Sequence, residues 1–265
     1  KHGKKIFIIT NSDFEYTNLL LTHAINGYLD EGQTWSDLFE YVITLADKPR
    51  FFYDKLRFLS IDPQSGKMSN VNGKLQPGIY QGGCATKFTN DLQLNGDQIL
   101  YIGDHIYGDV LRLKKDCNWR TALVVEELGL EISGQQKAKP YHDKINQLID
   151  DKRLLESRYT DFSSKQIEEN TTQYKEEIET ILKQVVAIDK EIKLALDKMR
   201  VCFNPHWERV FRAGAEESYF AHQVNRFACI YMEKISDLFN CSPRTYFRAK
   251  QRKLSHELND FASLD

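Results

Sequence analysis

Residues 98–109 read Gln-Ile-Leu-Tyr-Ile-Gly-Asp-His-Ile-Tyr-Gly-Asp, and this stretch decides the fold of the chain. The short apolar run before Gly103 predicts a buried parallel strand, which ends at Gly103 and Asp104. Asp109 then opens a helical pattern. The two carboxylates therefore fall at the carboxyl end of a strand, which is the edge of an open α/β sheet where ligands bind. They suit a hard cation such as Mg²⁺, although a simple turn with Asp109 as a helix cap would use the same residues.

The strand–helix alternation on either side of this stretch predicts a parallel α/β sheet. The predicted elements are a strand at 6–9, a helix at 16–29, a short helix at 35–39, a strand at 41–45, β-hairpins over 58–80, a helix at 86–94, a strand at 99–102 and a strand at 121–125. A buried strand so close to the first residue leads us to expect that the chain is the later part of something longer.

The pattern changes after about residue 136. Apolar residues from Ile167 to Met199 alternate four and three apart, which predicts one helix of more than thirty residues with a heptad seam. The preceding segment has similar spacing, so we expect an antiparallel helical hairpin. Our predicted division is a sheet core at 1–135, the hairpin at 136–200 and a helical region at 201–265. The seam and the aromatic residues of the last region lead us to expect a homo-oligomer. These aromatic residues are Trp207, Phe211, Tyr219, Phe220, Phe227 and Tyr231.

Composition excludes several classes of partner. The 36 basic and 38 acidic residues nearly cancel, which gives no general attraction to nucleic acids or membranes. A local basic group, which we interpret as a solvated helix face, comprises Arg244, Arg248, Lys250, Arg252 and Lys253. Five scattered cysteines without a Cys-x-x-Cys pair argue for a reducing compartment and against a disulfide framework or a zinc site. No apolar run approaches the roughly 20 residues of a membrane span. We therefore expect a cytoplasmic protein.

Two further strand ends carry polar residues. Thr10, Asn11 and Ser12 follow the first strand and could cradle a phosphate at a helix start, although Ser12 or Asp13 could equally be an N-cap. Lys48 follows the strand at 41–45 and could neutralise a phosphate or a charged nucleophile, although it could also be a surface lysine. Because strand ends share one edge of a sheet, we expect these residues to lie near Asp104 and Asp109.

Three motifs together resemble a known family. They are Ile-Thr-Asn-Ser-Asp-Phe-Glu-Tyr-Thr at 9–17, Ala-Asp-Lys-Pro-Arg-Phe-Phe at 46–52 and Tyr-Ile-Gly-Asp-His-Ile-Tyr-Gly-Asp at 101–109. They look like motifs two, three and four of the haloacid dehalogenase superfamily, and more narrowly like its cytosolic purine 5′-nucleotidase branch, which acts on IMP and GMP. The resemblance continues through 118–121, 210–214 and 220–227. It implies a Rossmann-like parallel core.

The resemblance also implies roles for the strand-end residues. Thr10 and Asn11 would hold phosphoryl oxygens with support from Ser12. Lys48 would be a catalytic residue that stabilises negative charge around the nucleophile and the phosphate. Asp104 would bind Mg²⁺ directly, and Asp109 would orient a metal-bound water or the lysine. The implied reaction is Mg²⁺-dependent hydrolysis of purine nucleoside 5′-monophosphates through an aspartyl-phosphate.

The chain departs from the family at its first motif. No Asp-x-Asp occurs in the 265 residues, so the nucleophile and general acid of the family are absent from them. The purine-reading cap of the family is absent as well, and base preference is left open. We expect the chain to be a C-terminal portion that works with an N-terminal part of the same protein, and a true pseudoenzyme is the second interpretation. The alternative functions are a phosphatase or phosphotransferase of the same superfamily with another substrate, and a non-catalytic nucleotide-binding scaffold.

The family also binds activating nucleotides at a subunit interface. By resemblance, the effector contacts would fall on Lys115, Gln223, Arg226 and Phe227. The alternative is structural, with Arg226 as an ion-pair partner and Phe227 as a core aromatic residue.

Overall fold

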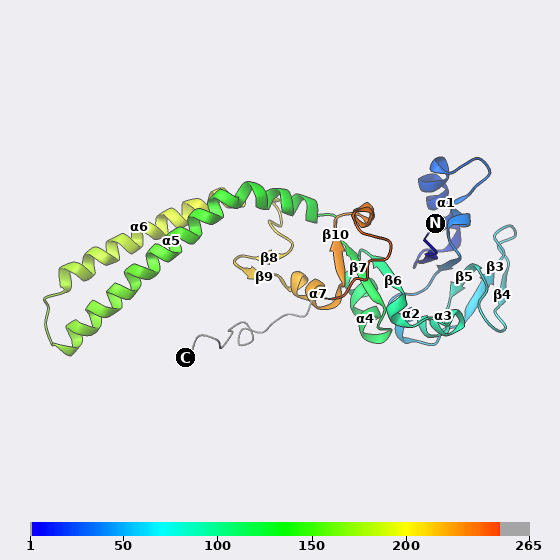
Figure 1. The fold of residues 1–265 in the computed structure, drawn as a ribbon, viewed down its shortest axis with the longest axis horizontal. Coiled ribbons are helices and arrows are strands. Elements are labelled where there is room, and N and C mark those ends of the chain that lie inside the picture. Colours follow the sequence, from blue (N-terminus) through cyan, green and yellow to red (C-terminus); the bar gives the residue numbers. More distant parts are fainter. Residues whose placement is uncertain (1, 250–265) are drawn as a thin grey trace. The chain divides into compact units, whose positions relative to one another are not determined.

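The computed structural model describes residues 2–249 and divides the chain into two compact units. One unit comprises Lys1–Val125 together with the described residues from Tyr219 onward, and the other comprises Glu126–Ser218. The first unit contains two sheets with helices around them, and the second is dominated by two long helices (Figure 1). The predicted α/β class is confirmed. Lys250, Arg252 and Lys253 of the predicted basic helix face lie outside the described residues.

The larger sheet has five strands in the order β1-β2-β5-β3-β4. Their bounds are β1 Phe7–Ile9, β2 Tyr41–Thr44, β3 Phe58–Ile61, β4 Met68–Asn70 and β5 Gly78–Gly82. β1, β2 and β5 run parallel, whereas β3 is antiparallel to both β4 and β5. The predicted parallel strands are present in β1, β2 and β5. The antiparallel strands β3 and β4 fall in the region 58–80 where β-hairpins were predicted, because short reversals such as the one at 62–67 can join only antiparallel strands.

The smaller sheet is parallel throughout and has the order β10-β7-β6. β6 is Leu100–Gly103, β7 is Arg120–Val124 and β10 is Ile230–Met232. The expectation of a helical region from 201 onward is wrong at β10. Only α7, Tyr219–Phe227, and the short 3₁₀ segment η5, Ile235–Asn240, are helical between 201 and 249. Three apolar residues after α7 pair with β7, since a buried parallel partner outweighs local helix preference.

Short helices connect the strands of this first unit. They are α1 Phe14–Ile25, η1 Asn26–Tyr28, η2 Trp35–Leu38, α2 Arg50–Tyr53, α3 Ala85–Leu92, η3 Gly96–Gln98, η4 Ile106–Leu111 and α4 Arg112–Asp116. All but one are α or 3₁₀ helices, and η4 is a π-helix. Each predicted helix of the first 125 residues is present within a few residues of its expected bounds, as are the predicted strands.

An aromatic core joins the two sheets. The Phe7 ring of β1 lies 5.2 Å from Phe88 of α3 and 6.2 Å from Trp119, measured between ring centroids. Tyr101 of β6 lies 6.2 Å from Trp119 and 5.8 Å from Phe52 of α2. Trp119 and Phe88 are fully buried. This packing places the carboxyl end of β6 next to the carboxyl ends of β1 and β2.

The second unit is a helical hairpin, as predicted. Its helices are α5 Leu128–Glu168 and α6 Lys175–Arg200, which lie side by side (Figure 1), and a short antiparallel pair follows them, β8 Arg212–Ala213 and β9 Glu216–Glu217. The single helix expected from Ile167 to Met199 is wrong, because the reversal falls inside that seam. Asn170 adopts a positive φ of 45°, which ends the helical run. On α6 the seam residues Ile181 and Ala195 are buried.

No helix in the described part of the chain combines the length and apolar character that a membrane span requires. All five cysteines are free thiols.

Candidate active site

The predicted site residues follow three strands whose carboxyl ends meet. Thr10 to Ser12 follow β1, Lys48 follows β2, and the segment from Asp104 to Asp109 follows β6. β1 and β2 are parallel neighbours with Ile9 opposite Ile43, so their loops leave the same edge of the sheet. In the structure, Lys48 contacts both Asp109 and the loop after β1 directly. These contacts show what each loop contributes.

The loop after β1 is held closed by its own polar groups. The Thr10 hydroxyl oxygen accepts a hydrogen bond from the Ser12 N–H at 3.1 Å. Asp13, rather than Ser12, caps α1, since its carboxylate accepts the Tyr16 N–H at 2.8 Å. With Asp13 as the cap, Ser12 is not needed for that role. The loop thus presents a threonine hydroxyl and backbone N–H groups beside a helix start, a suitable environment for an anion.

Asn11 ties this loop to the one after β2. Its side-chain amide donates to the Lys48 carbonyl at 3.0 Å and accepts the Lys48 N–H at 2.6 Å. Both ends of the amide therefore position the lysine backbone. A direct contact of the Asn11 side chain with phosphate, as predicted, would compete with this pairing. The structural effect of Asn11 is to hold Lys48.

Lys48 is not a surface lysine. Its side chain is only 15% exposed, and its ammonium lies 2.8 Å from Asp109 Oδ1 and 3.0 Å from the Tyr101 hydroxyl. The loop that delivers it contains two non-glycine residues in the left-handed region, Leu45 with φ 42° and Asp47 with φ 56°. Such strained backbone is retained where the surrounding structure requires one loop path.

Asp109 is buried and uses both carboxylate oxygens. Oδ1 accepts from Lys48, and Oδ2 accepts the His105 N–H at 3.3 Å. The residue lies in the π-helix η4, which begins after His105 and turns the carboxylate back toward β6. Gly103 makes room for it, because a Cβ at position 103 would lie 2.5 Å from Asp109 Cβ. The glycine of this motif is therefore a packing requirement.

Asp104 differs from Asp109 in being exposed at the end of β6. The described residues contain no group of three or more His, Cys, Asp or Glu side chains that could hold a metal ion. Mg²⁺, however, is commonly held by one or two carboxylates together with waters and substrate phosphate oxygens. The open carboxylate of Asp104 fits such a partial site. The carboxylate of Asp109, occupied on both oxygens, fits only an indirect role.

Tyr101 is the one member of the cluster that the sequence interpretation missed. Its hydroxyl lies 3.3 Å from both Asp109 Oδ1 and the Ile9 carbonyl oxygen, in addition to its contact with Lys48. Burial, together with the nearby Asp109 carboxylate, raises the pKa of Tyr101 above its ordinary value, so the phenol stays protonated. The sequence signal that could have identified Tyr101 was its hydroxyl, which falls inside the otherwise apolar run of β6.

The residues expected to contact an effector also cluster. The Lys115 ammonium lies 5.3 Å from the centre of the Phe227 ring, and the Arg226 guanidinium lies 5.1 Å from the same ring. Phe227 and Gln223 are buried, whereas Lys115 and Arg226 are exposed. The buried ring agrees with the structural alternative for Phe227, while the two exposed cations remain able to meet an anion.

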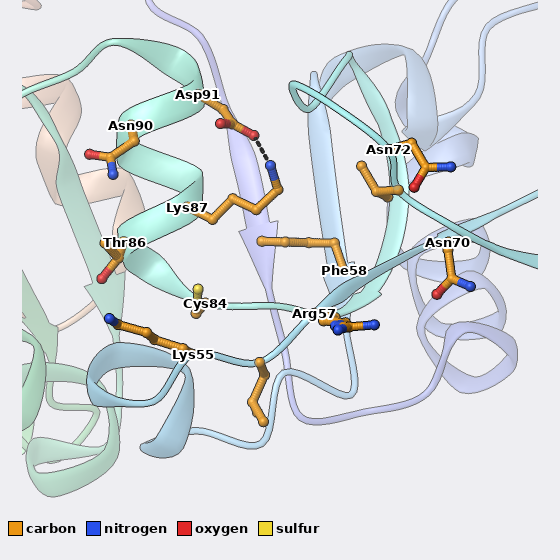
Figure 2. Close-up of a pocket in the computed structure, with 12 residues that line it drawn as sticks. Lys55, Arg57, Phe58, Asn70, Asn72, Cys84, Thr86, Lys87, Asn90 and Asp91 are labelled. Carbon is orange, nitrogen blue, oxygen red and sulfur yellow. Dashed lines mark hydrogen bonds and ion pairs between the residues drawn. The ribbon is translucent and has the colours of Figure 1, made fainter.

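A separate surface pocket of ≈ 580 Å³ lies beside α3. Figure 2 shows it between α3 and the segments around Phe58 and Asn70, with the Lys87–Asp91 ion pair on its wall. Lys55 and Arg57 also line it. None of the predicted site residues is part of its lining, so it is distinct from the cluster around Lys48.

Comparison with known protein families shows which family the chain belongs to. The model of the 5′ nucleotidase family matches residues 1–259. The chain belongs to the 5′-nucleotidase family. Relatives include a 5′-nucleotidase domain-containing protein of Dictyostelium discoideum, 29% identical over 259 residues, and 5′-nucleotidase domain-containing protein 2 of Rattus norvegicus, 30% identical over 261 residues.

Both matches to 5′-nucleotidase family members cover 97% of this chain, but they cover only 41% of the Dictyostelium protein and 43% of the rat protein. The chain thus spans about two fifths of the length of these relatives.

Proposed function

We propose that this chain supplies the charge-stabilising part of a phosphoryl-transfer site that hydrolyses nucleoside 5′-monophosphates. The observation that carries the proposal is the buried pair of Lys48 and Asp109, 2.8 Å apart, tied through Asn11 to the loop after β1. A largely buried lysine held by a carboxylate at a sheet edge is fixed in place. Phosphoryl transfer depends mainly on such positioning and charge stabilisation.

Each residue has a role that follows from its contacts. Lys48 provides a positive charge for the phosphoryl oxygens, and Asp109 keeps that charge in place from the opposite side. The Thr10 hydroxyl and the N–H groups beside Ser12 bind phosphoryl oxygens. Asn11 acts mainly by holding the Lys48 backbone, with contact to phosphate as its second role.

Asp104 would be the protein ligand of Mg²⁺, and Asp109 would meet the ion's water shell at most. When bound, the ion would offset negative charge on the transferring group. The remaining donors would come from water and from the substrate, which is the usual arrangement for this cation.

The nucleophile is the main part that these residues do not provide. The 265 residues contain no Asp-x-Asp, so an aspartyl-phosphate would have to form on an aspartate outside this chain, with a second acid protonating the leaving 5′-oxygen. The purine nucleotides IMP and GMP are the preferred substrates in this proposal, on the strength of the motif resemblance. We also propose a cytoplasmic homo-oligomer in which Lys115 and Arg226 bind the phosphate of a nucleotide effector.

The test uses the full-length protein that contains this chain. Phosphate release is measured from IMP, GMP, pyrimidine 5′-monophosphates and a simple sugar phosphate, with and without Mg²⁺. We expect release from purine nucleotides that requires Mg²⁺. Asp104→Asn should abolish most of it, whereas Asp97→Asn, which changes an exposed acid before β6, should leave it unchanged.

Other outcomes separate the alternatives. Preferential release from the sugar phosphate would favour a different phosphomonoester as the substrate. Absence of release from every ester, together with retained nucleotide binding, would favour a non-catalytic scaffold and overturn the proposal. Full activity of Asp104→Asn would overturn the metal assignment alone.

A further inference from the structure

Tyr101 lies where the three strand ends meet. Its hydroxyl oxygen is 3.0 Å from Lys48 Nζ, 3.3 Å from Asp109 Oδ1 and 3.3 Å from the Ile9 carbonyl. The side chain thus touches the residue after β2, the carboxylate after β6 and the last residue of β1. The residue itself is only 5% exposed.

The direction of each hydrogen bond follows from the chemistry of the groups. An ammonium has three donors and no acceptor, so the Tyr101 oxygen accepts from Lys48. The single phenolic proton then goes to Asp109 or to the Ile9 carbonyl, which are equally distant. The phenol is therefore a neutral link between a cation, a carboxylate and a backbone carbonyl.

This link restricts the orientation of the Lys48 ammonium. In the described part of the chain, its acceptors are Asp109 Oδ1 and the Tyr101 oxygen. One hydrogen bond alone would leave the ammonium free to rotate about that contact. Two hydrogen bonds fix the group, and the third N–H then has a single direction.

We propose that Tyr101 is a positioning residue, which holds the Lys48 ammonium so that its third N–H is directed at the phosphoryl group. The inference rests on the proposed function for its catalytic consequence, but the Lys48–Tyr101 contact can be tested without it. The hydroxyl is the part that matters. The ring itself packs in the aromatic core, 5.8 Å from Phe52 and 6.2 Å from Trp119.

The experiment compares Tyr101→Phe with Tyr80→Phe in the full-length protein. Both changes remove one hydroxyl from a buried tyrosine of a β-strand, and each residue is 5% exposed. The Tyr80 hydroxyl bonds to the backbone of Gln76 just before β5, so this control loses a structural hydrogen bond at the other end of a strand. Only Tyr101→Phe removes a partner of Lys48.

The first readout is acylation of Lys48 by acetic anhydride, measured by mass spectrometry relative to exposed lysines. Tyr101→Phe should increase acylation of Lys48 several-fold, because the amine loses an anchor, while Tyr80→Phe should match the wild type. The second readout is nucleotide hydrolysis. We expect kcat to fall about tenfold with KM nearly unchanged in Tyr101→Phe, since a displaced charge weakens stabilisation of the transition state.

Two results would overturn the proposal: unchanged Lys48 acylation in Tyr101→Phe, or an equal increase in Tyr80→Phe. If the wild type hydrolyses no nucleotide, the proposed function fails, yet the acylation experiment still decides the positioning role. If Tyr101→Phe does not fold, 3-fluorotyrosine at position 101 replaces it. That side chain keeps the hydroxyl but makes its oxygen a weaker acceptor, so a smaller increase in acylation is expected and no increase would contradict the proposal.

Discussion

In the sheet unit, the Lys48 ammonium lies 2.8 Å from the Asp109 carboxylate, and the two side chains are 15% and 6% exposed. In the helical hairpin, the Lys152 ammonium lies 2.7 Å from the Asp189 carboxylate, but those side chains are 27% and 50% exposed. The two pairs share chemistry and distance. They differ in how much water surrounds them.

This difference determines what each pair contributes. A partly exposed pair is screened by water and salt, and each partner is well solvated when the other is removed. A buried pair has lost that solvation, so removal of one partner leaves an uncompensated charge inside the protein. The buried pair therefore fixes the position of the Lys48 ammonium, as a catalytic site requires. The more exposed pair links α5 to α6 at the surface of the hairpin.

The largest effect is expected from Asp109→Ala. This change leaves the Lys48 ammonium buried without its carboxylate, which should lower the free energy of unfolding by about 3–5 kcal/mol. Urea denaturation of the full-length protein, followed by circular dichroism, measures this. Nucleotide hydrolysis should be lost in the same variant.

A double variant provides the control for this first prediction. Asp109→Leu combined with Lys48→Met removes both charges and should recover much of the stability but none of the activity. If Asp109→Ala alone unfolds at the wild-type urea concentration, the pair is not effectively buried in solution, and the contrast with the hairpin fails.

The next largest effect is expected from Gly103→Ala. The added Cβ would lie 2.5 Å from Asp109 Cβ and 2.7 Å from Asp109 Oδ2, so the carboxylate must move. Overpacking of this kind should cost about 1–3 kcal/mol and should reduce hydrolysis as well. Gly27→Ala is the matched control, because a Cβ there meets no atom within 4 Å. Equal stability of the two variants in urea denaturation would show that the site relaxes around the methyl group.

Much of the fold could be predicted from sequence because local patterns dominated. The run before Gly103 gave β6, and the reversal signals between Asp62 and Gly66 gave the β3–β4 hairpin. The errors arose where pairing between segments far apart in the sequence determines the secondary structure. β10 is helical or irregular by local pattern, yet it forms a strand because β7, more than a hundred residues earlier, offers a buried edge. In the hairpin, the heptad spacing ran through the reversal, and Asn170 ended the helix within it.

The candidate site was predictable as a set of strand ends, since parallel strands that end together bring their loops together. The contacts within it were not. Asn11 suggested a phosphate ligand, but its amide turns to the Lys48 backbone. Tyr101 looked like an ordinary core residue, because the partners of its hydroxyl come from three separate segments. Such side-chain pairings depend on packing that a one-dimensional pattern does not contain.

A smaller effect is expected from Asp91→Asn in the wall of the pocket beside α3. Burial alone would raise the pKa of Asp91, but hydrogen bonds from Lys87 Nζ at 2.6 Å and the Leu75 N–H at 3.0 Å outweigh it, so the pKa lies below its ordinary value. A lowered pKa stabilises the fold above the unfolded-state value of about 3.9, and this contribution disappears as the pH falls through the folded-state pKa.

Asp91→Asn should therefore cost about 1 kcal/mol at neutral pH, with the difference from wild type shrinking below about pH 4. Thermal unfolding measured across this pH range gives the result. Asp97→Asn, an exposed acid of η3, serves as the control and should follow the wild-type profile. A difference for Asp91→Asn that stayed constant from neutral to acid pH would mean that the carboxylate's charge is not what stabilises the wall.

The smallest effect is expected from Asp189→Asn, which removes the ion pair between Lys152 and Asp189 in the hairpin. Lys152 keeps a second carboxylate, Glu156, at 3.8 Å, and its side chain is partly exposed to water, so its charge is not left uncompensated. The urea midpoint should match the wild type at high salt and fall only slightly at low salt, where screening is weak. A decrease in the free energy of unfolding as large as that of Asp109→Ala would contradict this expectation. It would mean that the distance between the charges, which the two pairs share, determines their contribution to stability, and that burial does not.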